Sequence, residues 1–213
     1  MRDSQASATA SEVAPDPLID IVVDLIDTQG YDAVQLREVA RRARMSLTTI
    51  YKRYPTRDEL IVAALRWWMD THRYAALTSD RAPSSEESIY DGLMWIFRTI
   101  FEPWEKHPHM LQAYVRAKAG PGGAALTQHG FDVVVPAALA VLSNCDDRFA
   151  EDVGVILTGI VYGTLGQFAS GAIAITDIVP TIERTVYWLT KAHENVYGDR
   201  RPETGFGTGL FVR

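Results

Sequence analysis

The sequence predicts an all-α protein with two parts, a three-helix N-terminal head and a larger helical domain. Apolar residues recur at helical spacing along most of the chain, and no run alternates with a period of two for long enough to form a sheet. The 213 residues are 47% hydrophobic and 23% charged, which is typical of a globular protein with a buried core. At roughly 150 residues per domain, this length allows a small domain joined to a larger one.

The N-terminal region predicts three short helices before Pro55. The first begins at Pro17 and ends before Gly30, and the second runs from about residue 36 to residue 43. Ser46 is a good N-cap for a third helix, about 47–54, which Pro55 ends. The first helix is clearly amphipathic because its apolar residues repeat at i, i+3, i+4, i+7 and i+8: Leu18, Ile21, Val22, Leu25 and Ile26.

Six longer helices are predicted after the head. The fourth helix is capped by Thr56, has acidic residues in its first turn and continues to about Leu77. The loop-like stretch 78–87 then indicates a boundary. The remaining helices are expected at 88–102 with a break at Pro103, and at 108–118, 125–142, 148–170 and 178–197. The predicted organisation is a disordered tail at 1–14, a head at 15–60, a second domain at 61–197 and a loose tail at 198–213.

Charge, cysteine content and the N-terminal residues limit the class of protein. A net charge of −6 excludes a uniformly basic coat for nucleic acid but allows a local basic patch. Cys145 is the only cysteine, which excludes an internal disulfide framework and a Cys-rich metal site and favours a reducing, cytoplasmic location. Residues 1–14 are polar and lack the apolar stretch of a signal peptide.

A basic patch lies between Gln35 and Arg57. This segment holds seven basic residues and one acidic residue, a net charge of +6 in an acidic chain. Such a patch is the expected footprint of phosphate binding. Two short helices joined by a tight turn at residues 44–45 also have the helix-turn-helix layout. The second of them would expose short hydroxyl and cationic side chains, which suits reading of the DNA major groove.

The segment Gly30–Leu60, GYDAVQLREVARRARMSLTTIYKRYPTRDEL, resembles the helix-turn-helix signature of the TetR family of bacterial transcription regulators. The hallmark pair of the recognition helix stands here as Ile50-Tyr51, with Tyr54 packing behind it. The match covers about residues 18–65. Two positions depart from the family pattern: Arg44 stands where a glycine is common in the turn, and Gln35 stands where a threonine often precedes the second helix.

The resemblance implies a homodimeric regulator, expected to be a repressor that releases a palindromic operator on double-stranded DNA when a small hydrophobic effector binds. It implies base or groove contacts from Arg37, Leu47, Thr48 and Thr49. It implies phosphate contacts from Gln35, Tyr51, Arg53 and Arg57, with Lys52 as an addition.

Large apolar side chains in the second domain are candidates for an effector cavity. In the family the corresponding helices surround a ligand, and aromatic and methionine side chains suit an apolar effector. A weaker likeness, in AVQLREVA and at His107-Pro108, is to actinobacterial repressors of sterol and fatty-acid catabolism, which favours an acyl or steroid-like compound. Plain core packing is the alternative for each candidate: Trp95, Phe101, Met110, Tyr114 and Phe131.

The stretch Val153–Thr176 has no charged residue for 24 positions, long enough to span a membrane. Its five glycines, its polar residues and the aspartates at both ends favour a helix buried on most faces inside protein instead. Gly159 and Gly163 have a spacing that lets two helices approach closely. Together with the final helix, where Ile182 and Val186 share one side, this fits the family's four-helix dimer interface; an intramolecular core helix is the alternative.

The sequence offers little for an enzyme, and no cofactor or metal is expected. His107 and His109 lack helical metal spacing and a carboxylate cluster. Residues 120–123 lack the lysine and the strand of a phosphate loop. Two rival hypotheses remain: a helical lipid-binding protein or enzyme with an incidental basic patch, and a dimeric adaptor that binds no DNA.

Overall fold

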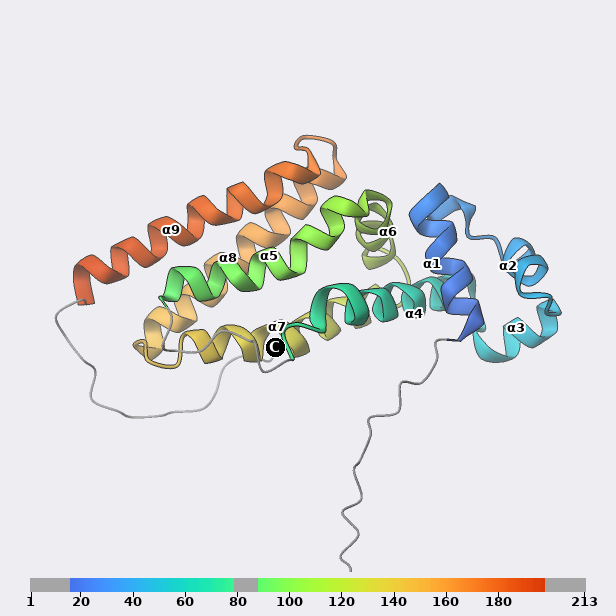
Figure 1. Cartoon of the computed structure of the whole chain (residues 1–213), viewed down its shortest axis with the longest axis horizontal. Coiled ribbons are helices and arrows are strands. Elements are labelled where there is room, and N and C mark those ends of the chain that lie inside the picture. Colours follow the sequence, from blue (N-terminus) through green and yellow to red (C-terminus); the bar gives the residue numbers. More distant parts are fainter. Residues whose placement is uncertain (1–15, 79–87, 198–213) are drawn as a thin grey trace, which may run out of the picture.

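The computed structural model describes residues 16–78 and 88–197; the predicted tails and all but the first residue of the predicted loop 78–87 lie outside them. Every regular element of this described part is a helix, as predicted (Figure 1). The head consists of α1 (Pro17–Gln29), a 3₁₀ turn (Tyr31–Ala33), α2 (Leu36–Ala43) and α3 (Leu47–Arg53). These bounds agree with the predicted ones to within one residue.

After the head, α4 (Arg57–Met69) leads into the second domain and continues into a π-helical turn (Asp70–Tyr74). In Figure 1 the head lies at one end of an elongated molecule, and α4 leads from it toward the other helices. At the far end α9 packs on both α5 and α8, and α6 lies between this group and α1. The remaining helices are α5 (Ile89–Lys106), α6 (Pro108–Lys118), α7 (Gly123–Val141), α8 (Asp147–Ala169) and α9 (Ile178–Tyr197).

The predicted helix break at Pro103 is wrong, because α5 continues through this proline to Lys106. A proline inside a helix removes one hydrogen bond and crowds the preceding turn. The neighbouring Trp104 explains why the helix persists, since only 2% of it is exposed. Its ring centroid lies 5.6 Å from that of Phe101 and 5.0 Å from that of Tyr114. Burial of this large aromatic side chain offsets the cost of the proline.

Trp68 lies where α4 meets the junction of α5 and α6. It is 2% exposed, and its ring is stacked on His72 with centroids 4.9 Å apart. Its ring also meets His107, the residue between α5 and α6, edge-on at 5.6 Å. One indole therefore joins the helix that leaves the head to the interior of the second domain.

A second connection between head and second domain runs through α6. The His107 imidazole and the Asp27 carboxylate are hydrogen-bonded at 2.8 Å, and Arg116 donates to the Asp32 carboxylate at 2.7 Å. Two guanidinium groups, those of Arg57 and Arg116, contact the Tyr31 ring, each with its Cζ 4.5 Å from the ring centroid. The head is thus held both by its continuation into α4 and by side-chain contacts with α6.

By length and composition, α7 and α8 could each cross a membrane, which by itself is weak support for a span. Within the single chain α8 differs from the prediction, because only 22% of its apolar window is buried. Its inner face packs on α9, but Val155 is 72% exposed. A Cβ atom added at Gly159 or Gly163 would meet no atom of residues 16–78 or 88–197 within 4 Å. The glycine stripe therefore lies on the outside of the chain.

Candidate nucleic-acid interface

The recognition helix α3 is fixed to the head by its cap and by one buried residue. The Ser46 hydroxyl accepts from the Thr49 N–H at 3.1 Å, the expected N-cap bond. Ile50 is fully buried, whereas Tyr51 is 49% exposed. These contacts leave Thr48, Tyr51 and Lys52 on the exposed surface of the helix.

The turn between α2 and α3 places Arg44 in the left-handed conformation, at φ 53° and ψ 38°. The Arg44 N–H donates to the Arg41 carbonyl at 3.4 Å, and the Met45 N–H donates to the Ala40 carbonyl at 3.0 Å. This is the pattern of a Schellman motif, which usually has glycine at this position. Arg44 is therefore a non-glycine residue held in a conformation that favours glycine.

Replacing Arg44 by glycine is expected to stabilise the protein by about 0.5–1 kcal/mol, because glycine adopts this conformation without a Cβ clash. Chemical denaturation monitored by circular dichroism would measure the change in the free energy of unfolding. Ala43→Gly is the matched control, since Ala43 is helical and should lose stability instead. Equal destabilisation by both substitutions would show that Arg44 is not strained.

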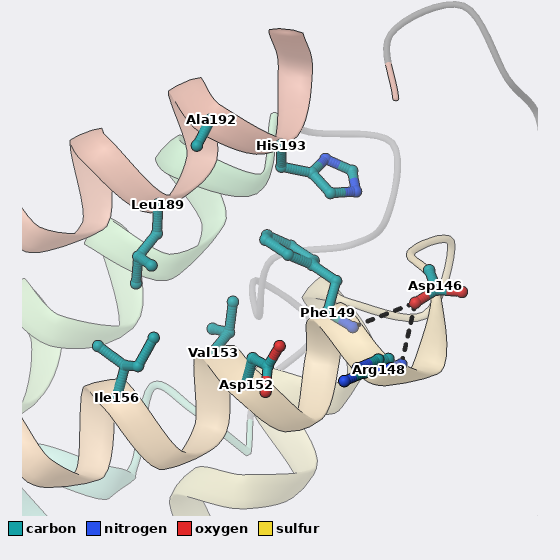
Figure 2. A pocket seen from close by; sticks show the side chains of 9 residues that line it. All are labelled: Asp146, Arg148, Phe149, Asp152, Val153, Ile156, Leu189, Ala192 and His193. Atoms are coloured by element: carbon teal, nitrogen blue, oxygen red, sulfur yellow. Dashed lines mark hydrogen bonds between the residues drawn. The ribbon is translucent and has the colours of Figure 1, made fainter. Parts of the chain in front are cut away.

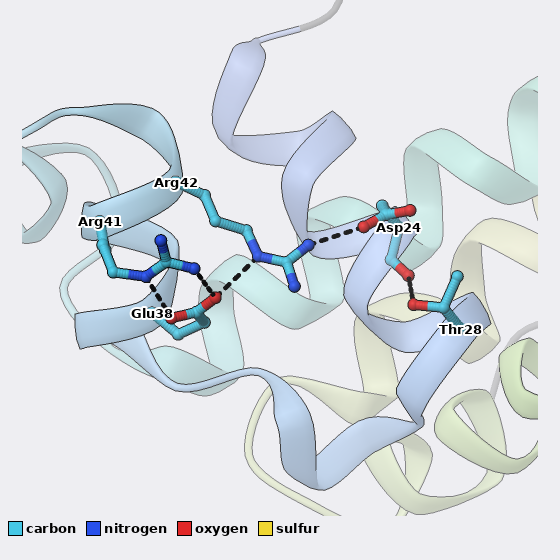
Figure 3. Close-up of polar contacts among 5 residues, drawn as sticks. All are labelled: Asp24, Thr28, Glu38, Arg41 and Arg42. Carbon is cyan, nitrogen blue, oxygen red and sulfur yellow. Dashed lines mark hydrogen bonds and ion pairs between the residues drawn. The ribbon is translucent and has the colours of Figure 1, made fainter.

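Figure 3 shows how part of the basic patch is neutralised within the head. Glu38 accepts two hydrogen bonds from Arg41, at 2.7 and 2.8 Å, and one from Arg42 at 2.8 Å. Arg42 also donates to the Asp24 carboxylate of α1 at 2.8 Å. The hydrogen bonds from Arg41 and then Arg42 lower the pKa of Glu38 to about 2, so this carboxylate is ionised at neutral pH. Two of the seven cations are thereby paired.

Two further cations of the patch have structural partners. Arg53 lies 3.0 Å from the Asp16 carboxylate, an exposed ion pair that a DNA phosphate could replace. The Arg57 guanidinium donates to the backbone carbonyls of Val34 and Tyr31. It therefore joins the start of α4 to the segment between α1 and α2. Among the described residues no acidic partner is found for three cations: Arg37, Arg44 and Lys52.

The structure brings all nine predicted DNA-contacting residues into the head, between the start of α2 and the start of α4. Gln35 is exposed and precedes α2 without a side-chain capping bond, as its poor capping chemistry suggests. Leu47 is half-buried against the core. Arg44 is exposed in the same basic segment and is an additional candidate for a phosphate contact, beyond the nine predicted residues.

The five predicted effector residues differ in their burial. Phe101, Met110 and Tyr114 are buried, Trp95 is half-buried and Phe131 is 36% exposed. A pocket of about 410 Å³ lies elsewhere, between α8 and α9 (Figure 2). A second pocket, of about 390 Å³, lies beside Tyr187 and Trp188 on α9. None of the five residues lines either pocket.

This arrangement defines a class of protein, a helix-turn-helix transcription regulator with a small DNA-binding head and a larger helical domain. Residues 18–64 match the family profile described as bacterial regulatory proteins, tetR family. Residues 87–189 match a second profile, the tetracyclin repressor-like C-terminal domain. The chain belongs to the TetR family, which consists of transcription regulators rather than enzymes.

Individual relatives agree with this assignment. The chain is 23% identical to the HTH-type transcriptional repressor KstR of Rhodococcus jostii over 206 residues, 94% of this chain and 92% of the relative. It is 27% identical to KstR of Mycolicibacterium smegmatis over 117 residues, 55% of this chain and 56% of the relative. A crystal structure of a TetR transcriptional regulator from Rhodococcus sp. RHA1 shares the fold with a TM-score of 0.57 at 17% identity, covering 81% of this chain and 95% of that one.

Proposed function

We propose that this cytoplasmic regulator is a repressor that binds a palindromic operator as a homodimer and releases it when a small hydrophobic effector binds. The observation that carries the proposal is the surface of α3, where the exposed hydroxyl groups of Thr48 and Thr49 share a short helix with Lys52, a cation without an acidic partner in the described head. Hydroxyl groups can read base edges, and cations hold phosphates and fix the register. The repressors among the relatives support the direction of regulation.

The DNA-binding roles can be separated by two variants of α3. Lys52→Ala should weaken binding to all DNA sequences and lower the slope of log affinity against log salt by about one. Thr48→Ala should instead relax the preference at one or two base positions, each worth about 1–3 kcal/mol. Fluorescence anisotropy with operator and random duplexes at several salt concentrations would measure both effects. Identical behaviour of the two variants on both duplexes would contradict these roles.

The dimer is proposed to form through the outer faces of α8 and α9. Val155 and Ile156 on α8 and Tyr187 and Trp188 on α9 are large apolar residues that are 42–72% exposed in the single chain. An exposed apolar patch of this kind typically marks a protein interface. The sequence assigned the side of α9 that carries Ile182 and Val186 to the dimer interface. This assignment is wrong, because both residues are fully buried within the chain. The outer face of α9 instead presents its aromatic pair.

The effector is proposed to be an apolar, acyl or steroid-like compound that enters among the aromatic side chains of α5 and α6. The buried Tyr114 and Trp104 are neighbours of the π-helical turn that continues α4, since Arg73 of this turn contacts the Trp104 ring. The same α6 carries His107 at its start and Arg116 near its end, which both bind the head. Displacement of α6 or α4 would change the separation of the two recognition helices, which must match half-sites about 34–36 Å apart.

A ligand screen tests this part of the proposal. At least one acyl or steroid-like compound should lower operator affinity, because it favours the arrangement that cannot bind DNA. Tyr114→Ala should raise the concentration of that compound needed for half-release by about tenfold. Operator release measured by anisotropy would give both values. An unchanged half-release concentration would move the effector site away from α6.

A further inference from the structure

Arg73 is a buried cation in the second domain, within the π-helical turn that follows α4. It is only 4% exposed, and its guanidinium donates to the Ile100 carbonyl at 2.6 Å and to the Tyr74 hydroxyl at 3.2 Å. Among the described residues no carboxylate pairs with it, and Asp70 on the same turn pairs with His129. A guanidinium removed from water without a counter-charge is unfavourable.

A second buried donor lies against this guanidinium. The Arg73 Cζ is 3.4 Å from the centroid of the Trp104 ring. The Trp104 Nε1 atom is buried and has no hydrogen-bond acceptor among the residues that the structure describes. Buried donors of this kind are rare in native proteins and call for a specific explanation. A cation and an indole N–H thus meet at one place in the described interior, with no carboxylate between them.

The described surroundings of this cation add polar groups but no acid. Tyr114 packs against Trp104, and burial raises the pKa of its hydroxyl to about 12, so the hydroxyl is protonated at neutral pH. A neutral apolar ligand would leave the guanidinium without a counter-charge and the indole N–H without an acceptor. A carboxylate would neutralise the Arg73 guanidinium and accept a hydrogen bond from the Trp104 indole N–H. Charge-assisted hydrogen bonds from arginine to a carboxylate are strong and geometrically specific.

We propose that the effector is an organic carboxylate whose carboxylate group pairs with Arg73 and accepts the Trp104 Nε1 hydrogen, while its apolar part packs among the surrounding aromatic side chains. This inference rests on the proposed release of the operator by an effector. It narrows that effector from apolar compounds in general to amphipathic anions.

The position of Arg73 connects this site to the head. Its bond to the Ile100 carbonyl ties the π-helical turn to α5, and the turn directly continues α4. A carboxylate would compete with the Ile100 carbonyl for the guanidinium and so weaken the hydrogen bond between the π-helical turn and α5. Single π-helical turns are frequent at functional sites, since they hold a helix in a locally altered register. Carboxylate binding would thereby act on the helix that emerges from the DNA-binding head.

The inference is tested by calorimetric titration of the protein with sets of ligands. The members of each set share one apolar body and differ only in their polar end group. The probes are decanoate, decanamide and decylamine, together with a steroid carboxylate and its amide. For at least one apolar body the carboxylate should bind about 10–150-fold tighter than the amide, the range for a hydrogen-bonded charged group. The amine should bind most weakly, because its charge repels the guanidinium.

Variants assign that preference to particular atoms. Arg73→Met should reduce the carboxylate preference to within about threefold, whereas Trp104→Phe should reduce it by about fivefold. Lys118→Met is the matched control, because Lys118 lies over the ring of Tyr162 instead, with its Nζ 3.6 Å from the centroid. It should keep the full preference. Arg73→Lys, which keeps the charge but loses the planar fork, should give an intermediate value.

The outcomes separate this inference from the function on which it rests. Equal binding of carboxylate and amide, with operator release by both, would overturn the carboxylate and leave the effector in place. Binding of none of the probes would overturn both proposals. Should Arg73→Met fail to fold, an unchanged carboxylate preference in both Arg73→Lys and Trp104→Phe would be the contradicting result.

Discussion

Gly163→Leu is expected to convert the dimer into monomers and to lower operator affinity about 100-fold or more. The reason is geometric, because the Gly163 Cα faces open space in the single chain and would face the partner helix in the proposed interface. A leucine there would hold the two α8 helices apart. Each monomer could then engage only one half-site and would lose the gain of about 10²–10⁴ that joined binding supplies. Sedimentation velocity and anisotropy would measure the two effects.

Two controls make this test specific. Gln112→Leu adds the same side chain to an exposed position on α6 and should remain dimeric. The melting temperature of the Gly163→Leu monomer shows whether the chain still folds, since a side chain in open space should not disturb the protomer. A folded Gly163→Leu variant that stays dimeric would place the interface on another surface.

Trp68→Ala is expected to lower the free energy of unfolding by about 3–5 kcal/mol, the range for truncating a buried aromatic residue. Such a loss is a large part of the total stability of a typical domain. The indole packs against His72 and His107 at the point where α4 meets the α5–α6 junction. The cavity would therefore loosen the contact between the head-bearing helix and the second domain. Urea denaturation followed by circular dichroism would give the value.

The neighbouring Trp67 is the natural control for this substitution. It has the same side chain but is only half-buried, so Trp67→Ala should destabilise by about 1 kcal/mol. A similar loss in the free energy of unfolding for both variants would show that the buried packing of Trp68 does not stabilise the protein more than the half-buried Trp67 does.

The head was predictable from the sequence because its signals are local. Pro17, Ser46 and Thr56 are cap or first-turn residues, and all three act as such in the structure. The apolar stripe of α1 repeats at helical spacing, and Leu18, Val22 and Ile26 are fully buried. Local capping chemistry and hydrophobic periodicity together determine where such short helices begin and end.

The misjudged features depend on contacts between distant residues. The passage of α5 through Pro103 follows from the packing of Trp104 against α6, which is invisible in the local sequence. Likewise, the partners of Arg53 and Arg57 lie 23–37 positions away along the chain. The burial of Arg73 has the same origin, because its acceptor at Ile100 belongs to another helix. A charge pattern can identify a basic patch but cannot show which of its cations are already paired.

The contact of Tyr31 with both Arg57 and Arg116 bears on how regulators of this kind can be recombined. Consider a hybrid that receives residues 15–60 from a member without a tyrosine at position 31 and an aspartate at position 32. It would keep Arg116 on α6 but lose the ring that Arg116 contacts. Because Arg116 also pairs with Asp32, such a hybrid would leave one guanidinium without either neighbour. The head is therefore not a self-contained cassette. A workable junction would transfer the α6 surface, including His107 and Arg116, together with the DNA-reading helices.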